Sequence, residues 1–305
     1  MINIPKQETF AKTELINKGA SSDTKYYIET FDSQRLLLRI SNAKEYENIK
    51  IQHSMLERLS KLGISMSRPI EFGLCENNES IYQLLTWVDG EDLESALPTM
   101  QKEKQYNSGL KTGRLLRKIH SIPSSGDTNE WDMYFGRILQ DELEMYYSNK
   151  ELHCEIGEII TNYFRDNPNV TGTHPRTFMH GDYHLANIIL MPCGEIGAID
   201  FACGYGDPYW DIFKVAWRPY MYPLFFSGMI RGYFNNAPSI EFWKAYNHYF
   251  AYGALVASRA PKWAGFNTLE EGRDVAKNIL AWSDNFKTPT PSWYLAEHDD
   301  FASSP

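Results

Sequence analysis

The sequence predicts an α+β protein in which a small, β-rich N-terminal lobe precedes a larger, mainly helical C-terminal lobe. Short β-favouring runs separated by polar turns come first, at residues 25–30, 35–40, 70–74 and 81–86. Beyond Gly90 the apolar residues recur with helical spacing, over residues 102–120, 133–147, 151–164 and 269–282. No flexible spacer separates the strand-rich part of the sequence from the helical part, so we expect two lobes around a cleft, residues 1–88 and 89–305.

The N-terminal lobe should consist of a small sheet that carries one helix. Residues 31–34, Phe-Asp-Ser-Gln, are typical of a hairpin turn between the first two β-favouring runs. Over residues 43–62 the apolar side chains instead fall on one helical face, and Gly63 follows as a stop signal. We therefore expect one helix between the second and third strands.

The C-terminal lobe contains an unusually aromatic segment, residues 208–257. Its aromatic residues favour two or three packed helices, with most rings in the core and a few available to a substrate pocket. The residues after Lys287 include several prolines and are expected to be irregular.

Composition limits the partners of this chain. The 305 residues carry a formal net charge of −9, which argues against nucleic acid because phosphate backbones require clustered Lys and Arg. The same charge is compatible with a small cationic molecule. No apolar run is long enough to span a bilayer and no signal-peptide pattern begins the sequence, so we expect no membrane partner and a cytoplasmic location. Four dispersed cysteines are expected to be reduced thiols.

The segment from Met179 to Phe201 carries the clearest chemical pattern. Asp182 lies in a polar stretch, and Asn187 follows five residues later. Two short apolar runs around a Pro-Cys-Gly-Glu turn then predict a hairpin, which ends at Asp200. That hairpin would fold Asp200 back beside Asn187. A carboxylate base and two hard oxygen ligands suit phosphoryl transfer from a magnesium-bound nucleotide.

These residues resemble the aminoglycoside phosphotransferase family, which shares the protein-kinase-like fold with choline kinases. The pattern HGDxxxxN is met by residues 180–187, and Asp200 stands in an Ile-Asp-Phe triplet where the family places its second metal ligand. The sequence DPYWDIFK at 207–214 follows in the family order. The resemblance covers most of the chain and is weakest in its C-terminal part. It implies a two-lobed protein-kinase-like fold and a small-molecule kinase.

The resemblance also implies roles for residues of the central motif. Asp182 would be the catalytic carboxylate that orients or deprotonates the acceptor hydroxyl. Asn187 and Asp200 would hold Mg²⁺ against the phosphates of ATP or GTP. His184 would touch the transferring phosphoryl group or shape the loop through a hydrogen bond. His180 would brace this loop.

Asp211 resembles the family residue that bonds the loop backbone from a following helix, and we interpret it as structural. The nucleotide contacts of the N-terminal lobe match the family less closely. Ser21 and Ser22 stand where kinases place a phosphate-covering loop, although an ordinary turn is the alternative. Arg39 replaces the family's phosphate-binding lysine, or it is a surface strand residue.

A helix residue should pair with Arg39 if the kinase arrangement holds. Gln52 falls near the place of the usual glutamate, and three nearby glutamates are alternatives: Glu45, Glu47 and Glu57. The segment that joins the lobes should present backbone groups of Thr86, Trp87 and Val88 to the purine.

Two other readings of the central motif stay open. His180, Asp182 and His184 also resemble the ligand clusters of metallohydrolases, although the remaining histidines are scattered. A non-catalytic kinase-like binding module is the second alternative, but such a module would be expected to lose Asp182, Asn187 or Asp200.

For a kinase, the acceptor could be an aminoglycoside, drawn by C-terminal carboxylates such as Glu241, Asp284, Glu297, Asp299 and Asp300. It could instead be choline, caged by aromatic rings. A macrolide, a peptide antibiotic or a metabolite is also possible. The expected partners are therefore a nucleotide and a small, amine-bearing acceptor.

Overall fold

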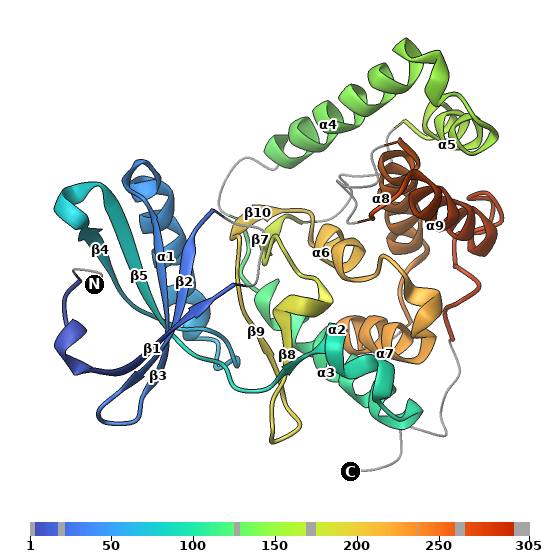
Figure 1. Ribbon diagram of the computed structural model, residues 1–305. Helices are drawn as coiled ribbons and strands as arrows, with labels where there is room; N and C mark the ends of the chain where they lie inside the picture. The colour runs from blue at the N-terminus through green and yellow to red at the C-terminus, as the bar shows by residue number, and fades with distance from the viewer. Residues whose placement is uncertain are drawn as a thin grey trace. The chain divides into compact units, whose positions relative to one another are not determined.

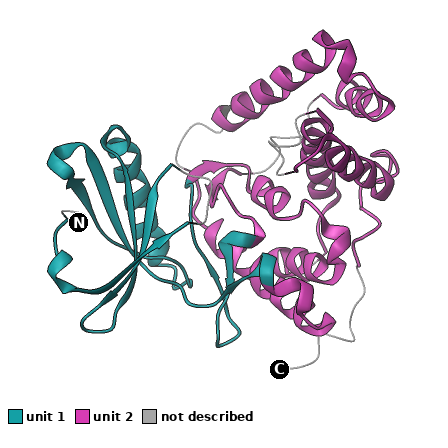
Figure 2. Cartoon of the chain, viewed as in Figure 1, with its two compact units in different colours: residues 1–95, 186–203 teal, residues 96–185, 204–305 magenta. Residues whose placement is uncertain are grey.

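The computed structural model describes six stretches of the chain, residues 4–17, 22–124, 129–168, 175–235, 237–259 and 266–295. The chain divides into two compact units (Figure 2). Unit 1 consists of Met1–Ser95 and Ala186–Cys203, and unit 2 consists of Ala96–Leu185 and Gly204–Pro305.

Unit 1 is built on a five-stranded antiparallel sheet in the order β1-β2-β3-β5-β4 (Figure 1). The strands are β1 (Phe10–Ile16), β2 (Thr24–Thr30), β3 (Arg35–Asn42), β4 (Pro69–Cys75) and β5 (Ser80–Thr86). Helix α1 (Tyr46–Ser60) follows β3, as the helical pattern predicts. Short 3-10 helices flank these elements: η1 (Gln7–Thr9), η2 (Ala43–Glu45) and η3 (Glu76–Asn78).

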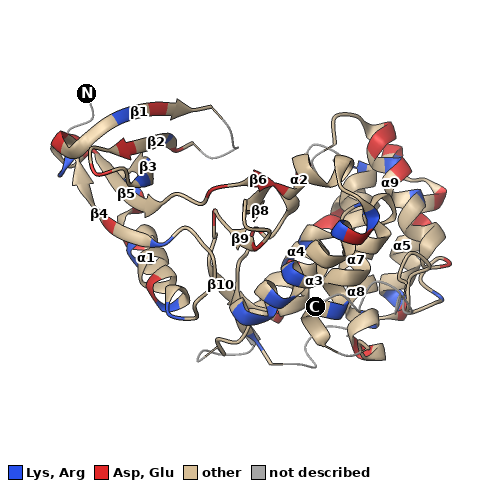
Figure 3. Cartoon of the chain, turned by 90° about the horizontal axis from the view of Figure 1, so that it is seen from below, with Lys and Arg blue, Asp and Glu red and all other residues tan. Residues whose placement is uncertain are grey.

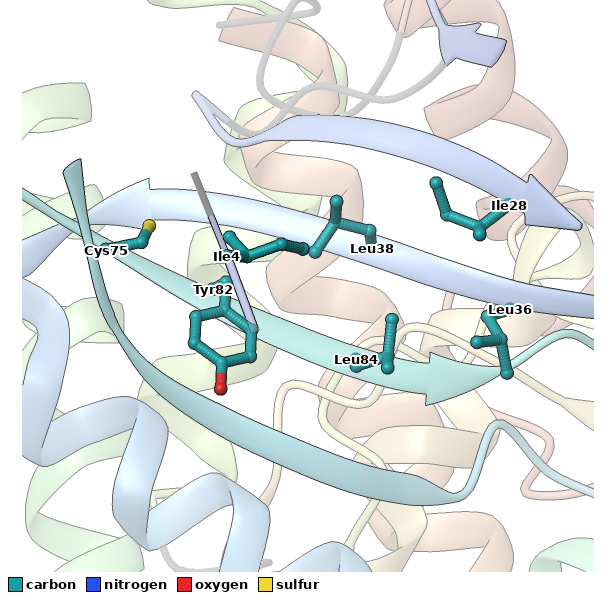
Figure 4. Close-up of a cluster of buried hydrophobic side chains, with 7 residues drawn as sticks. All are labelled: Ile4, Ile28, Leu36, Leu38, Cys75, Tyr82 and Leu84. Atoms are coloured by element: carbon teal, nitrogen blue, oxygen red, sulfur yellow. The ribbon is translucent and has the colours of Figure 1, made fainter. Parts of the chain in front are cut away.

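The two faces of this sheet differ in character because side chains alternate along each strand. One face carries the hydrophobic cluster drawn in Figure 4, formed by Ile4, Ile28, Leu36, Leu38, Cys75, Tyr82 and Leu84. In the β2–β3 register, Ile28 pairs with Leu36 on this face. Lys25 pairs with Arg39. Along their strands these two residues are an odd number of positions from Ile28 and Leu36, so both cations belong to the opposite face. The apolar pattern thus determines which face presents charge.

A second, three-stranded sheet also belongs to unit 1, in the order β6-β8-β9. Its strands are β6 (Glu91–Asp92), β8 (Ile188–Leu190) and β9 (Ile196–Ala198). Gly90 has a φ of 140°, and a Cβ atom there would lie 2.2 Å from the Leu190 carbonyl oxygen, so this position requires glycine. Because β6 pairs with β8, residues 186–203 join unit 1 across a long sequence distance. The predicted division at residue 88 followed sequence order alone and stays a prediction.

Unit 2 is mainly helical. Its long helices are α3 (Lys102–Ile119), α4 (Asn129–Ser148), α5 (Glu155–Asp166), α6 (Pro208–Val215), α7 (Pro223–Phe234), α8 (Ile240–Arg259) and α9 (Leu269–Trp282). A two-stranded sheet joins β7 (Thr177–Met179) to β10 (Gly204–Gly206). The short elements are α2 (Leu93–Ala96) and η6 (Leu185–Asn187), which straddle the unit boundaries, with η4 (Leu97–Thr99), η5 (Lys150–Leu152) and η7 (Pro219–Met221). The predicted α+β class, β-rich first and helical second, is confirmed.

Helices α3 and α7 cross with their backbones in direct contact. A Cβ atom at Gly113 would lie 2.0 Å from the Met229 carbonyl oxygen, and one at Gly232 would lie 2.2 Å from that of Leu110. Gly109 and Gly228 are similarly close to the facing helix. Two glycines four residues apart on each helix therefore permit this close approach.

The aromatic segment predicted at 208–257 forms α6, α7 and α8, and most of its rings are core. Tyr246, Tyr249 and Phe250 of α8 are fully buried and pack edge-on or tilted against neighbouring rings. Among the described residues, no helix has the length and apolar character needed to cross a membrane.

Candidate active site

The loop that carries Asp182 begins directly after β7. His180 is fully buried, and its Nδ1 atom accepts a hydrogen bond of 3.2 Å from the backbone N–H of Asp182. Nδ1 is thus the unprotonated ring nitrogen of His180. Gly181 has a φ of 82°, which favours glycine. His180 therefore braces the loop, as expected.

Asp211 of α6 holds the same loop by accepting hydrogen bonds from its backbone. Its Oδ2 atom accepts from His180 N–H at 2.7 Å, and Oδ1 accepts from Gly181 N–H at 3.0 Å. Asp211 Oδ2 also lies 3.1 Å from His120 Nε2, whose other nitrogen lies 2.9 Å from the Tyr233 hydroxyl. A carboxylate only accepts, so His120 Nε2 donates to Asp211. The structural role predicted for Asp211 is confirmed.

Asp182 and His184 are neighbours on this loop. The His184 Nε2 atom lies 3.4 Å from Asp182 Oδ2, and both side chains are about half exposed. Burial by itself raises the pKa of Asp182, but the His184 hydrogen bond and the charges of His184 and Lys214 outweigh it and lower the pKa. Asp182 is therefore ionised at neutral pH and able to accept a proton.

Asn187 and Asp200 both lie at the open end of the β8–β9 hairpin, Asn187 directly before β8 and Asp200 shortly after β9. The register Ile188 to Ala198 places the residues beyond it side by side, and Ile199 N–H donates to the Asn187 carbonyl oxygen at 3.0 Å. Asp200 itself has a φ of 58°, a left-handed conformation that Asp tolerates better than most residues. The predicted return of Asp200 to the neighbourhood of Asn187 is confirmed within unit 1.

Two cations of the five-stranded sheet reach Asp200. Arg39 Nη1 lies 2.8 Å from Asp200 Oδ1, and Lys25 Nζ lies 3.1 Å from Asp200 Oδ2. Arg39 also donates through Nε and Nη2 to Asp23 Oδ2, at 3.2 and 2.6 Å. Arg39 is thus a largely covered member of a charge cluster, with 13% of its side chain exposed, rather than a surface strand residue. Sequence reasoning missed Lys25 and Asp23, although strand alternation places Lys25 on the face of Arg39.

The helix partner expected for Arg39 has a different role. Gln52 donates from Nε2 to the Phe201 carbonyl oxygen at 2.6 Å, and its Oε1 lies 3.3 Å from Gln83 Nε2. The three helix glutamates interact locally instead, Glu45 with Asn48, Glu47 with Lys50 and Glu57 with His53. Within the described part of unit 1, Asp23 is the carboxylate that holds the Arg39 guanidinium together with Asp200.

The segment expected to contact the purine has two of its amides engaged. Thr86 N–H donates to the Arg68 carbonyl oxygen at 2.9 Å, and Trp87 N–H donates to that of Arg35 at 3.0 Å. The Trp87 ring packs edge-on against Tyr27 at 4.9 Å. The backbone N–H groups of Thr86 and Trp87 are therefore already hydrogen-bonded, and a purine contact at Thr86, Trp87 or Val88 stays a prediction.

The loop expected to cover the phosphates is described only at its end. Ser21 lies outside the described residues, whereas Ser22 is exposed. Ser22 lines a pocket of about 450 Å³ with Thr24, Tyr26 and Ile40 among its neighbours. Tyr26 and Ile40 pack against the hydrophobic cluster of Figure 4, so this pocket lies on the face opposite Lys25 and Arg39. The pocket gives no support to a phosphate contact at Ser22.

Comparison with known proteins identifies the family. A family model named APH and described as the phosphotransferase enzyme family matches residues 12–246, which include every site residue described above. The chain belongs to this phosphotransferase family. No curated protein matches the sequence.

Solved structures of phosphotransferases share the fold over nearly the whole chain. A choline/ethanolamine kinase family protein from Mesorhizobium loti is 15% identical, with a TM-score of 0.62 over 96% of this chain and 95% of that chain. ADP-bound aminoglycoside phosphotransferase APH(2'')-Ib is 16% identical, with a TM-score of 0.57 over 90% and 94%. An amicoumacin kinase in complex with AMP-PNP, Ca²⁺ and Ami is 17% identical, with a TM-score of 0.56 over 91% and 90%. These likenesses confirm the kinase-like fold.

The donor set of this phosphotransferase suits the divalent metal that the resemblance implies. Asn187 and Asp200 offer an amide oxygen and a carboxylate, and Mg²⁺ commonly takes one or two protein carboxylates together with phosphate and water oxygens. In the described part of the chain, no three His, Cys, Asp or Glu side chains form a metal cluster. A site completed by substrate phosphates is compatible with that finding.

Proposed function

We propose that this chain transfers the γ-phosphoryl group of ATP or GTP to a hydroxyl of an amine-bearing small molecule, with an aminoglycoside as the acceptor class. The observation that carries the proposal is the Asp182 loop. Asp211 holds its backbone through two hydrogen bonds, and the pKa of Asp182 is lowered by its cationic neighbours. An ionised carboxylate on a loop whose backbone is held in place suits the orientation and deprotonation of an alcohol.

In the proposed reaction, Asp182 orients the acceptor hydroxyl and receives its proton as the oxygen attacks the γ-phosphorus. A bond forms between the acceptor oxygen and phosphorus, and the bond from the γ-phosphorus to the bridging oxygen breaks. The electron pair of that bond stays with the departing nucleoside diphosphate. His184, beside Asp182, stabilises its ionised form and contributes positive charge when protonated.

Asn187 and Asp200 are the proposed magnesium ligands. The metal supplies charge neutralisation at the phosphates and orients them when bound. Arg39 is proposed to contact the phosphates through its planar fork of donors, which suits bidentate binding. The comparison with ADP-bound and AMP-PNP-bound relatives supports a nucleotide donor, which is why a nucleotide stands in the proposal.

An aminoglycoside acceptor is supported by charge. The chain has a formal net charge of −9, and Figure 3 marks Asp and Glu on elements of both units. Glu241 and Asp284 are exposed, whereas Glu297, Asp299 and Asp300 lie outside the described residues. A choline cage has less support, because most rings of α6 to α8 are buried in ring–ring contacts. A cytoplasmic location, where nucleoside triphosphates are supplied, belongs to the same proposal.

The experiment that tests the function measures nucleoside diphosphate release with a coupled assay. ATP and GTP are each offered with aminoglycosides, choline, a macrolide and acceptor-free buffer. We expect release with aminoglycosides above the acceptor-free rate. Diphosphate release with choline and with no aminoglycoside would make choline the acceptor in place of an aminoglycoside. No release with any acceptor would contradict the proposal.

Two variants separate chemistry from nucleotide binding in the same assay. Asp182→Asn should lower transfer by roughly 10²-fold or more while leaving nucleotide affinity nearly unchanged. Asp200→Ala should weaken binding of the magnesium nucleotide. Unchanged turnover of Asp182→Asn would remove Asp182 from the mechanism, and unchanged affinity of Asp200→Ala would remove Asp200 from the metal site.

A further inference from the structure

Lys25 and Arg39 are direct neighbours across strands β2 and β3. They form a cross-strand pair in the register, on the sheet face opposite the hydrophobic cluster. Their side chains are only 12% and 13% exposed. Long cationic side chains are seldom so well buried unless anions compensate them. The two positive charges therefore require anionic partners at one place.

Two carboxylates supply that compensation in unequal shares. Arg39 pairs with both Asp23 and Asp200, at 2.6 and 2.8 Å. Lys25 pairs with Asp200 at 3.1 Å, and within the described residues Asp200 is the carboxylate at ion-pair distance from Lys25. Among the described residues the cluster thus holds two cations and two anions, and Asp200 is the one carboxylate there that pairs with Lys25.

Engagement of Asp200 by a metal changes this balance. An Asp200 carboxylate that coordinates magnesium neutralises Lys25 and Arg39 less well. Arg39 keeps its second partner, Asp23, which holds the guanidinium through two donors. Lys25 would become a poorly exposed ammonium group without a carboxylate partner, which is an unfavourable state. The anionic oxygens of the nucleotide phosphates could replace the Asp200 carboxylate as the partner of Lys25, because lysine binds phosphate well as a point charge.

We propose that Lys25 is a phosphate-contacting lysine of this chain and that it acts with Arg39 as a two-cation clamp on the nucleotide phosphates. In this arrangement the lysine comes from β2, and an arginine occupies the β3 position. Asp23 is the positioning residue that keeps the Arg39 guanidinium oriented. The inference rests on the proposed nucleotide-dependent function and names a nucleotide-binding residue that sequence reasoning did not find.

The test measures binding rather than turnover. Isothermal titration of the parent, Lys25→Met and Lys12→Met with ADP and GDP in magnesium is compared with titration with adenosine and guanosine. Lys12 is the matched control, because it lies on neighbouring β1, is 47% exposed and pairs with Glu14. We expect Lys25→Met to bind the diphosphates roughly 10- to 100-fold more weakly. Its nucleoside affinity, and both affinities of Lys12→Met, should match the parent.

Further outcomes distinguish the clamp from a structural role and from the function itself. Lys25→Arg keeps the charge and should restore most of the diphosphate affinity. Equal losses for diphosphate and nucleoside would indicate a structural role, and an unchanged diphosphate affinity of Lys25→Met would overturn the clamp alone. A parent protein that binds no nucleotide would overturn both the clamp and the proposed function. Far-UV circular dichroism verifies that each variant is folded before titration.

Discussion

The Oδ2 atom of Asp211 accepts a hydrogen bond of 2.7 Å from the backbone N–H of His180. The second carboxylate oxygen accepts from Gly181, and His120 Nε2 also donates to Oδ2. A fully buried carboxylate with this many donors links α6, α3 and the loop that carries Asp182. The conformation of the proposed catalytic loop thus depends on a residue that need not touch substrate.

Asp211→Asn should destabilise unit 2 and lower transfer together. The amide keeps the volume but replaces one acceptor oxygen with a donor, so a buried backbone N–H loses its partner. We expect a loss of about 3 kcal/mol in the free energy of unfolding. Urea unfolding and the coupled assay measure the two effects. Asp274→Asn is the matched control, because its ion pair with Lys277 is exposed and should be worth less than about 1 kcal/mol. Equal stabilities of the two variants would contradict the assigned role.

His184→Gln should move the acid limb of the pH–rate profile to higher pH. His184 is the strongest influence that lowers the pKa of Asp182 against burial, so its removal raises that pKa. A raised pKa means that the carboxylate is protonated, and inactive as a base, at a higher pH than in the parent. The measurement is kcat/KM against pH, which reports groups of the free enzyme. Lys277→Met, which removes an exposed cation, serves as the control and should leave the limb in place. An unmoved acid limb in His184→Gln would count against Asp182 as the titrating base.

Gly113→Ala should destabilise the chain through the α3–α7 crossing. The added methyl group would lie 2.0 Å from the Met229 carbonyl oxygen, so the two helices would have to separate. We expect a loss of about 3 kcal/mol in unfolding free energy. Gly136→Ala in α4 is the matched control, since no atom lies within 4 Å of its added carbon. That control should gain about 0.5 to 1 kcal/mol from helix propensity. If Gly113→Ala and Gly136→Ala changed the thermal unfolding temperature alike, the α3–α7 crossing would be less tightly packed than described.

His248→Phe should reduce the acid sensitivity of the fold. Burial lowers the pKa of His248 to about 4 from its usual 6.5, and the ring packs against Phe135 and Phe164. Because the folded-state pKa is depressed, the unfolded state binds more protons between these values, and stability falls as pH drops from 6.5 to 4. The contribution is on the order of 3 kcal/mol. Urea unfolding at pH 7.5, 5.5 and 4.5 should show that the free energy of unfolding falls less with decreasing pH in the variant than in the parent. Parallel pH profiles of parent and variant would assign the acid sensitivity to other groups.

Local pattern was sufficient for most elements of the chain. The helix predicted at 269–282 agrees with α9, because Thr268 caps its first turn and its apolar residues repeat every three or four positions. The β8–β9 hairpin formed as expected, since its turn and strands lie close together in sequence. Strand β1 was missed because nearly all of its side chains are exposed, so that backbone pairing with β2 stabilises it instead of burial.

The sequence by itself determined the order of elements, the turn that returns Asp200 towards Asn187, and the family through the spacing of those residues with Asp182. Only the tertiary structure decided which charges meet. The pairing of Lys25 and Arg39 with Asp200, and of Gln52 with the Phe201 carbonyl group, joins segments far apart in sequence. Such contacts depend on strand register and on packing of a hairpin against a distant sheet, and neither leaves a periodic trace in the chain.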